Sequence, residues 1–491
     1  MRRSALLPLT ALLAACASGP VSPPEVPAAE SYTAAPVGSP VATPELQGGQ
    51  AQQLVPGKDI PAEWWTLFQS ASLDALVRDA LAGSPSLARA NARLRQAEED
   101  YSARTGTQYP RIDAKLSANR VDAQPKSLGV QALPVQTPLN LFLASVSVSY
   151  TFDLFGSVRR ELEALRAETD YQRYELEAAR LMLAGNVVTA AIREASLREQ
   201  IALTEEMISL QARQLAIAEQ LERIGGAAKA DVVAQRLELA QTRAAMPDLQ
   251  RQLDQLRHRL AVYTGRPPSA AGIPEFRLSE LQLPAELPLS LPSELARQRP
   301  DIRAAEALLK QAGARVGVAT ANLYPQITLS ATAGSLASNG GDFLSGGTGF
   351  YLLGASLVQP IFRGDELQSK RRSAVAAYDQ AAAAYREAVL LGFQNVADAL
   401  RALETDAVKL RERSDAAGQA RTYHDIVSVR YSAGGVSFLA LLDAQRKLRG
   451  ARIDQTQAIA DRYADSAALL QALGGGWWKD EDRAEKQKDH P

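Results

Sequence analysis

The sequence has few of the residues on which enzyme chemistry usually depends. It contains one cysteine, three histidines and four methionines in 491 residues. It also lacks a glycine-rich phosphate loop after a strand and a cluster with metal-ligand spacing. We therefore expect neither catalysis nor a bound cofactor or metal.

Excess charge of one sign is also absent. The 54 basic residues are balanced by 55 acidic ones, which gives a formal net charge of −1. Nucleic acids and anionic surfaces attract a clustered excess of Lys and Arg. We therefore expect no nucleic acid among the partners.

The N-terminus carries a short apolar run, from Ala5 to Ala15, behind Arg2 and Arg3. This is typical of an export signal and is too short to span a bilayer. The run ends in Leu13-Ala14-Ala15-Cys16, which resembles the bacterial lipoprotein box. We predict a signal peptide over residues 1–15, lipidation of Cys16 and, with Ala17 beside it, sorting to the outer membrane. An ordinary signal peptide with a chance cysteine is the alternative.

Proline is unevenly distributed. Residues 16–61 are rich in proline and small residues and have no apolar period, which predicts an extended, lipidated tether. The charged residues 477–491 are expected to form a disordered end.

By contrast, no proline occurs in residues 139–246 or 365–431. Both stretches carry apolar residues at spacings of four and three, which predicts long helices with a coiled-coil seam. The seam residues would be Leu203, Met207, Leu210, Gln214, Ile217, Leu221 and Ile224 in the first, and Val389, Phe393, Val396, Leu400, Leu403, Ala407 and Leu410 in the second. Each helix ends at a glycine pair and is followed by another helix, so we predict two long helical hairpins.

Several residues recur at a constant distance. Pro85, Gln96, Tyr109 and Ile112 reappear 215 residues later as Pro300, Gln311, Tyr324 and Ile327. We predict two structural repeats, over residues 62–280 and 281–476.

After each Tyr-Pro pair the apolar period changes to two, which predicts strands at 112–119 and 326–333, each followed by a partner at 142–152 and 350–358. Such segments match the weak signature of a membrane β-barrel with a wet lumen, and a soluble sandwich is the alternative. Four strands are too few to close a barrel. A membrane barrel would therefore be shared by two, three or four chains.

These residues together resemble the outer-membrane efflux proteins, particularly the lipoprotein members that serve resistance-nodulation-division pumps. The most specific stretches are Tyr150-Thr151-Phe152-Asp153-Leu154-Phe155-Gly156 and Arg299-Pro300-Asp301-Ile302. Weaker ones are Trp64-Trp65, Pro360-Ile361-Phe362, Leu442-Asp443-Ala444-Gln445-Arg446 and Leu473-Gly474-Gly475-Gly476-Trp477. They run in family order along almost the whole chain.

The resemblance implies an α+β membrane protein that forms a homotrimer. Three chains would share a twelve-stranded outer-membrane β-barrel, four strands per chain, continuous with a long periplasmic α-helical coiled-coil barrel. It implies a passive exit duct for small molecules such as drugs, with a periplasmic adapter protein and an inner-membrane resistance-nodulation-division pump as partners and outer-membrane lipid around the barrel.

The resemblance also implies two kinds of site. The hairpin tips that would dock the adapter contain Gly226, Lys229, Asp231, Gly434, Ser437 and Leu439, and Lys229 is taken as the counterpart of Ser437. A periplasmic gate would use Gln394, Asp398 and Arg401, which share one helix face apart from the seam. Three copies of Asp398 would form a carboxylate ring.

Other functions remain open from the sequence. The duct could serve type I secretion or metal export instead, although no Met or His cluster favours a metal. A coiled-coil lipoprotein that only braces the envelope would leave the alternating strands unexplained. The cargo cannot be read from the residues.

Overall fold

The computed structural model describes residues 31–34, 47–122, 138–270, 272–342 and 347–478. Its residues group into two compact units: unit 1 is drawn from Leu94–Gln172 and Ala305–Tyr385, and unit 2 from Val26–Arg93, Arg173–Ala304 and Arg386–Pro491. Each unit combines segments from both halves of the sequence, so the predicted boundary at residues 280 and 281 does not separate them. Within the described residues, every helix is too short or too polar to cross a membrane.

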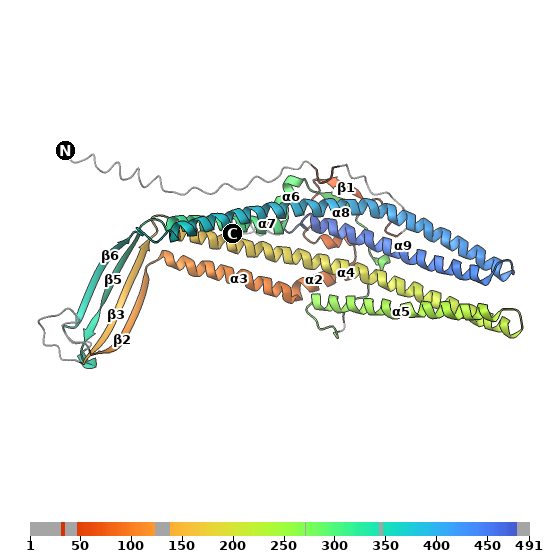
Figure 1. The fold of residues 1–491 in the computed structure, drawn as a ribbon, viewed down its shortest axis with the longest axis horizontal. Coiled ribbons are helices and arrows are strands. Elements are labelled where there is room, and N and C mark those ends of the chain that lie inside the picture. The colour runs from red at the N-terminus through yellow and green to blue at the C-terminus, as the bar shows by residue number, and fades with distance from the viewer. Residues whose placement is uncertain (1–30, 35–46, 123–137, 271, 343–346, 479–491) are drawn as a thin grey trace. The chain divides into compact units, whose positions relative to one another are not determined.

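Unit 1 contains one antiparallel sheet of four strands. The strands are β2 (Arg111–Val121), β3 (Leu139–Phe152), β5 (Gln326–Ala337) and β6 (Gly349–Val358), in the order β2-β3-β5-β6 (Figure 1). All four predicted strands are therefore confirmed. The pairing of β3 with β5 joins the first half of the sequence to the second within one sheet.

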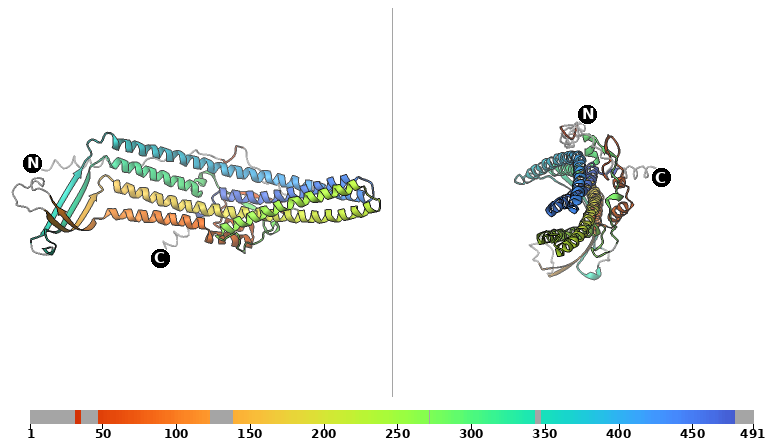
Figure 2. Two further views of the ribbon diagram at one scale, coloured as in Figure 1. Left: turned by 60° about the horizontal axis from the view of Figure 1, so that its bottom comes forward. Right: turned by 90° about the vertical axis from the view of Figure 1, so that its right-hand side faces the viewer.

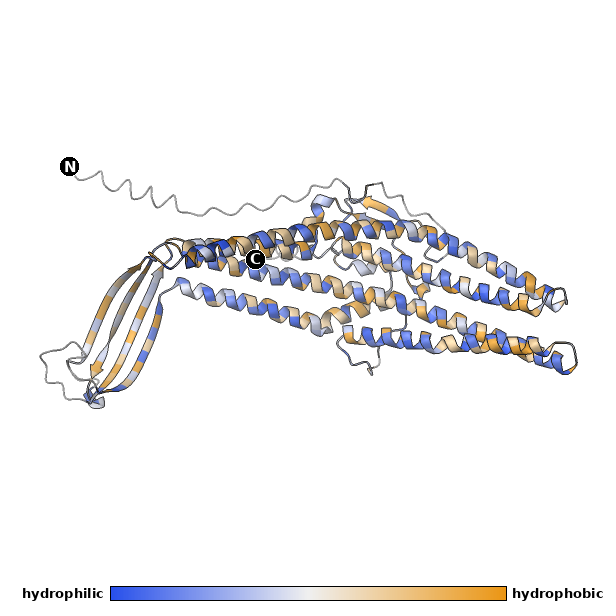
Figure 3. Cartoon of the chain, viewed as in Figure 1, coloured by the Kyte–Doolittle hydropathy of each residue, from blue (hydrophilic) through white to orange (hydrophobic). Residues whose placement is uncertain are grey.

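The register gives this sheet an apolar face and a polar face. Paired residues of antiparallel strands lie on the same face. One cross-strand row runs Ile112, Val148, Ala331, Leu353, and the adjacent row runs Arg111, Ser149, Ser330, Gly354. The next polar rows, Asp113, Ser147, Thr332 and Lys115, Ser145, Gly334, continue the alternation across β2, β3 and β5 (Figure 3), so the predicted period of two is confirmed there. In β6 the same rows end in Leu352 and Phe350, so the polar face is less strictly polar at that edge.

The outer strands of the sheet each have only one partner strand within the described chain. Every residue of β6 is exposed, and so are most residues of β2. Their exposed apolar side chains include Leu116 and Leu353. The isolated sheet thus leaves two edges able to pair with further strands.

The four strands are flanked along the chain by four helices. These are α3 (Pro85–Thr105), α4 (Ser157–Arg223), α7 (Pro300–Ala321) and α8 (Glu366–Ser432). Helix α4 starts where the Asp153 carboxylate accepts hydrogen bonds from the amides of Val158 (3.0 Å) and Arg159 (2.9 Å), which satisfies donors that a helix start leaves unpaired.

Both predicted hairpins are present. In unit 2, α4 lies beside α5 (Lys229–Tyr263) and α8 lies beside α9 (Phe438–Ala472) (Figure 2). Helices α4 and α8 have 67 residues each, and α5 and α9 have 35 each. Helix α5 runs through Pro247, which supplies no amide hydrogen for the helical ladder at that turn.

The predicted seam is confirmed in α8 and is partly wrong in α4. In α8, the side chains of Val389, Val396, Leu400, Leu403, Ala407 and Leu410 are buried. In α4, Met207 is buried, whereas Ile217 is 59% exposed, and Ile224, just after the last residue of the helix, is 76% exposed. The buried stripe of α4 passes instead through Thr204, Met207, Gln211 and Ala218, which keep spacings of three, four and seven but include two polar residues.

The rest of unit 2 contains short elements that precede each half of the fold. They are β1 (Gln53–Pro56), η1 (Trp64–Phe68), α2 (Ala71–Gly83), η4 (Leu278–Glu280), β4 (Glu286–Leu289) and α6 (Pro292–Gln298). Strands β1 and β4 pair in parallel. Trp64 and Phe68 are almost completely buried, and Phe68 contacts Tyr463 of α9 with ring centroids 6.3 Å apart.

The expectation of an extended tether up to residue 61 is wrong for its last part. The Gln52 side chain is buried and donates hydrogen bonds to the carbonyl of Pro284 (3.1 Å) and the hydroxyl of Ser466 (3.0 Å). The guanidinium of Arg462, also fully buried, donates to the carbonyls of Gly48 and Gln50, each at 2.7 Å. Proline-rich composition does not reveal such long-range contacts, so the predicted tether extends too far toward residue 61.

Candidate functional site

The first hairpin tip lies between α4 and α5. Its turn is made by Gly225, whose φ of +80° suits glycine, and the amide of Gly226 donates to the carbonyl of Leu221 at 2.8 Å. Helix α5 then begins at Lys229, which is exposed, with Ala228 at the N-cap and Asp231 in its first turn.

The second tip, between α8 and α9, has the same backbone arrangement. Gly434 has a φ of +73°, and the amide of Gly435 donates to the carbonyl of Arg430 at 2.8 Å. Ser437 is the N-cap of α9, but its side chain makes no capping hydrogen bond, and Leu439 is 66% exposed. The hydroxyl of Ser437 and the side chain of Leu439 are thus both available on the surface of this unit.

The two tips correspond in a way that corrects one sequence-based match. The left-handed glycines Gly225 and Gly434 are equivalent, and in each tip the N-cap follows three residues later. The counterpart of Ser437 is therefore Ala228. Matching Lys229 to Ser437 was wrong by one residue, because either glycine of the pair could be aligned when only the sequence was known.

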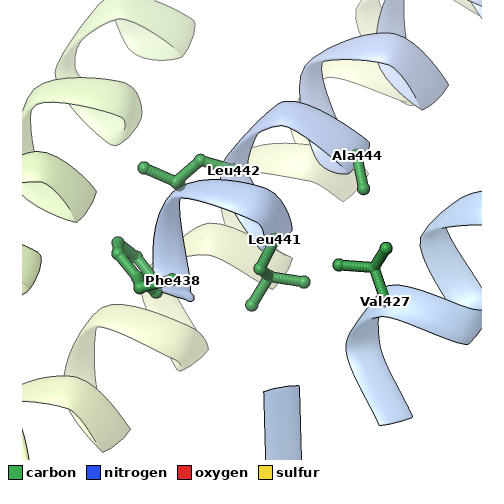
Figure 4. Close-up of a cluster of buried hydrophobic side chains, with 5 residues drawn as sticks. All are labelled: Val427, Phe438, Leu441, Leu442 and Ala444. Atoms are coloured by element: carbon green, nitrogen blue, oxygen red, sulfur yellow. The ribbon is translucent and has the colours of Figure 1, made fainter. Parts of the chain in front are cut away.

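A buried apolar cluster supports the second tip. It consists of Val427, Phe438, Leu441, Leu442 and Ala444 (Figure 4), with Ala234 of α5 packed against it. Tyr431 contacts Phe438 with ring centroids 5.6 Å apart. Burial, followed by the charge of Asp231, raises the pKa of Tyr431 above its usual value.

Polar contacts link the two hairpins above the tips. The Arg446 guanidinium donates to the Glu238 carboxylate at 2.5 Å, and Arg449 donates to the hydroxyl of Thr242 at 2.6 Å. Glu238 is 1% exposed. Further links join Gln445 to Gln214 and Arg452 to Glu206. The sequence pattern did not predict these contacts, because on a helix wheel they resemble ordinary polar positions.

The proposed gate residues share one face of α8, as predicted. Gln394 and Asp398 are exposed, and the Gln394 amide donates to the Asp398 carboxylate at 3.3 Å. Arg401 donates to Glu404 at 2.6 Å. Asp398 lies 34 residues before Ser432, the end of α8. At about 1.5 Å per residue this is roughly 50 Å along the helix, so a constriction at Asp398 would lie far from the hairpin tip.

A neighbouring carboxylic acid was missed. Asp406 of α8 is 7% exposed, and burial together with Asp465 of α9 raises its pKa to about 8. Its Oδ2 atom has no hydrogen-bond partner within the described residues. Periodicity alone could not identify it, because Asp406 adjoins the seam residue Ala407 and is also a normal residue on a wet helix face.

Cys16, the predicted lipidation site, and residues 479–491 of the predicted tail lie outside the described residues. Among the residues that the structure describes, no group of three or more His, Cys, Asp or Glu side chains is placed to hold a metal ion.

Comparison with known proteins identifies the family. A model described as "Outer membrane efflux protein" matches residues 76–266 and 291–475. The pyoverdine export outer membrane protein OpmQ of Pseudomonas aeruginosa is 31% identical over 486 residues, which is 98% of each chain. The probable efflux pump outer membrane protein TtgC of Pseudomonas putida is 29% identical and covers 94% of this chain and 93% of its own.

Solved structures agree with this result. The outer-membrane channel OprN superimposes with a TM-score of 0.79 at 28% identity, over 90% of this chain and 98% of its own. The open-state MtrE outer membrane channel of Neisseria gonorrhoeae superimposes with a TM-score of 0.76 at 26% identity, over 92% of this chain and 98% of its own.

An amphipathic sheet with open edges and two long helical hairpins, in one chain, defines an outer-membrane export channel protein. The chain belongs to the outer membrane efflux protein family. It is an efflux protein of the outer membrane that extends into the periplasm, and the resemblance seen in the sequence is confirmed.

Proposed function

We propose that three copies of this chain form the outer-membrane exit duct of a tripartite efflux system. The duct passively conducts small molecules, such as drugs, that a resistance-nodulation-division pump of the inner membrane delivers through a periplasmic adapter. The observation that carries this proposal is the four-stranded sheet with one apolar face, one polar face and two unpaired edges.

The two edges favour a barrel made from several chains. In lipid, each unpaired backbone group costs several kcal/mol, so the free edges of β2 and β6 must be paired. Pairing β6 of one copy with β2 of the next satisfies both edges, turns the apolar face to lipid and encloses the polar face. Three copies give twelve strands, the number that the family resemblance implies.

The equal lengths of α4 and α8, and of α5 and α9, support the two-repeat architecture. Three copies of two hairpins would build the coiled-coil barrel in the periplasm. Cys16 would carry the lipid that anchors the N-terminus, and the hairpin tips would dock the adapter.

Cysteine cross-linking tests the shared barrel. Pairs with one cysteine on β2 and one on β6 should link neighbouring copies in mild detergent and saturate at three chains. Single-cysteine variants on β3 or β5 serve as controls, because these strands are paired on both sides within the chain. A stable folded monomer, or saturation at another number, would contradict the trimer.

The names of the relatives include pyoverdine, antibiotic and toluene export. These labels belong to proteins that share only 29 to 31% of residues with this chain, and they differ from one another in cargo class. Membership of the family therefore supports small-molecule efflux. The chemical class of the cargo depends on the residues of this duct and on the pump that delivers the cargo.

A further inference from the structure

Unit 1 contains a cavity at the level where its strands join its helices. Its volume is about 1170 Å³, which exceeds the usual size of pockets that bind drug-sized molecules. The ends of all four strands and of α3, α4, α7 and α8 contribute to its lining. Sequence patterns do not predict this cavity, because its residues come from four separate segments of the chain.

The lining carries an excess of positive charge. Its basic residues are Arg104, Arg111, Arg315, Arg363 and Lys370, and its acidic residues are Asp153 and Glu161. Glu161 is already ion-paired with Arg104. Asp153 caps α4 and lies 3.5 Å from the guanidinium of Arg159. Neither acid is therefore available to neutralise the remaining cations.

Three of the arginines have no ion pair within the described part of the chain. Arg111, Arg315 and Arg363 are exposed, and none of them has a described carboxylate within 4.0 Å. Arg111 lies on the polar face of the sheet, in the row that contains Ser149 and Ser330. A guanidinium offers planar, paired donors that suit carboxylate and sulfonate groups.

Aromatic rings line the same cavity. Phe155 and Tyr324 stack with centroids 4.8 Å apart and an interplanar angle of 13°. Tyr109, which also lines the cavity, is 70% exposed. Such rings, next to guanidinium groups, provide flat surfaces for a planar ligand.

We propose that this cavity is a binding site for organic anions with a planar aromatic group, which occupy it while they pass through the duct. The inference rests on the proposed function, because the polar face of the sheet must enclose the conducting path. Arg111 and Arg315 attract and pair with the anionic group, and the aromatic residues contact its ring system.

Current block in planar lipid bilayers tests the proposal. The purified oligomer is exposed to the trisulfonated dye pyranine and, separately, to the cationic dye ethidium. Pyranine should block the wild-type current, and the Arg111→Gln/Arg315→Gln double variant should need at least about tenfold more dye for half-block, since two charge-assisted contacts are lost. Arg111→Lys should retain most of the block, and ethidium should not follow this pattern.

Arg251→Gln is the matched control, because Arg251 is an exposed arginine of α5 that lies outside the cavity lining. An equal effect of Arg251→Gln, or an unchanged pyranine block in the double variant, would overturn the proposal. A further outcome would assign the site to a lipid headgroup. In that case, phospholipid copurifies with the wild type but not with the double variant, while the pyranine block is the same in both. All variants should elute as the wild-type oligomer.

The proposed function and this inference fail in different ways. If the wild-type oligomer does not conduct, the exit-duct function is refuted. The cavity is then still decided by pyranine fluorescence anisotropy on the same protein, in which the double variant should bind about tenfold more weakly.

Discussion

Asp406 shows how a single buried carboxyl group can make a helical hairpin sensitive to pH. Asp465 and Asp461 approach it from α9, and Lys409 from α8, where Lys409 is ion-paired with Asp461. The charge of Asp406 also acts on Arg462 of α9, but the Arg462 guanidinium donates its hydrogen bonds to backbone carbonyls. Burial and the neighbouring Asp465 raise the pKa of Asp406 to about 8, and Lys409 and Arg462 have other partners, so Asp406 holds a proton at neutral pH.

We expect Asp406→Asn to reduce the loss of stability at alkaline pH. The folded-state pKa of Asp406, about 8, lies above the unfolded value of about 3.9. The contribution of this carboxyl group to the free energy of unfolding is therefore complete below about pH 4 and is lost as pH rises through 8. Between pH 6 and 9 the wild type should lose roughly 3 kcal/mol that the variant keeps, because about two pH units, at about 1.4 kcal/mol each, separate pH 6 from the folded-state pKa.

Thermal unfolding of the oligomer at pH 6 and pH 9 measures this difference. Asp415→Asn removes an exposed carboxylate from the same helix and should behave like the wild type. Parallel pH dependence in the wild type and Asp406→Asn would show that Asp406 is already ionised in the folded protein.

Asp398 provides a second prediction, about ion flow. Three copies of this exposed carboxylate, at one level of the coiled-coil barrel, would attract cations and narrow the path. Conductance of Asp398→Ala channels, measured without adapter, should therefore rise and lose its cation preference. Unchanged current and selectivity would place the gate at other residues, and the distance of Asp398 from the tip makes the last turns of α8 the next segment to examine.

At the scale of elements, the buried Glu238 determines how firmly the two hairpins are joined. Arg446→Met should loosen α5 from α9, because it leaves a carboxylate buried with only the more distant Arg449, 3.9 Å away. Loss of a partner from a fully buried ion pair typically costs about 3 to 5 kcal/mol. Here the Arg446 side chain is half exposed and the contact with Arg449 remains, so the cost should fall to roughly 2 kcal/mol.

Limited proteolysis of the hairpins and thermal unfolding should both detect the change. Lys447→Met is the control, since Lys447 and Asp443 form an exposed pair that contributes about 0 to 1 kcal/mol. Equal behaviour of the two variants would mean that the Arg446 contact does not couple the hairpins.

Most elements of this fold follow from local sequence. The long stretches without proline, together with the glycine pairs that end them, predicted α4, α5, α8 and α9 closely. The period of two predicted all four strands. The pairing of β3 with β5 and the burial of Gln52 could not be predicted, because they join residues far apart in the chain. The tips were located correctly, but the equivalence of Ser437 and Ala228 required the φ angles of the glycines.

At the scale of the whole molecule, anchoring by lipid and by a barrel should be separable. Since one acyl chain binds a membrane weakly compared with a spanning structure, Cys16→Ala should impair sorting more than membrane retention. Mass spectrometry of the mature N-terminal peptide should detect a diacylglyceryl group on Cys16. An unmodified peptide that starts elsewhere would refute lipidation.

The contacts of residues 48–56 also determine when the protein can finish folding. The Gln52 side chain donates a hydrogen bond to Ser466, 414 residues later, and β1 can pair only after β4 has been exported. During export the N-terminal segment enters the periplasm first, whereas β4 follows after more than half of the chain and Arg462 and Ser466 follow near its end. The early segment therefore lacks its full set of native partners until almost the whole chain has crossed the inner membrane, and contacts of such large sequence separation form slowly. Holding chaperones should consequently matter more for this protein than for one whose N-terminal segment folds on its own.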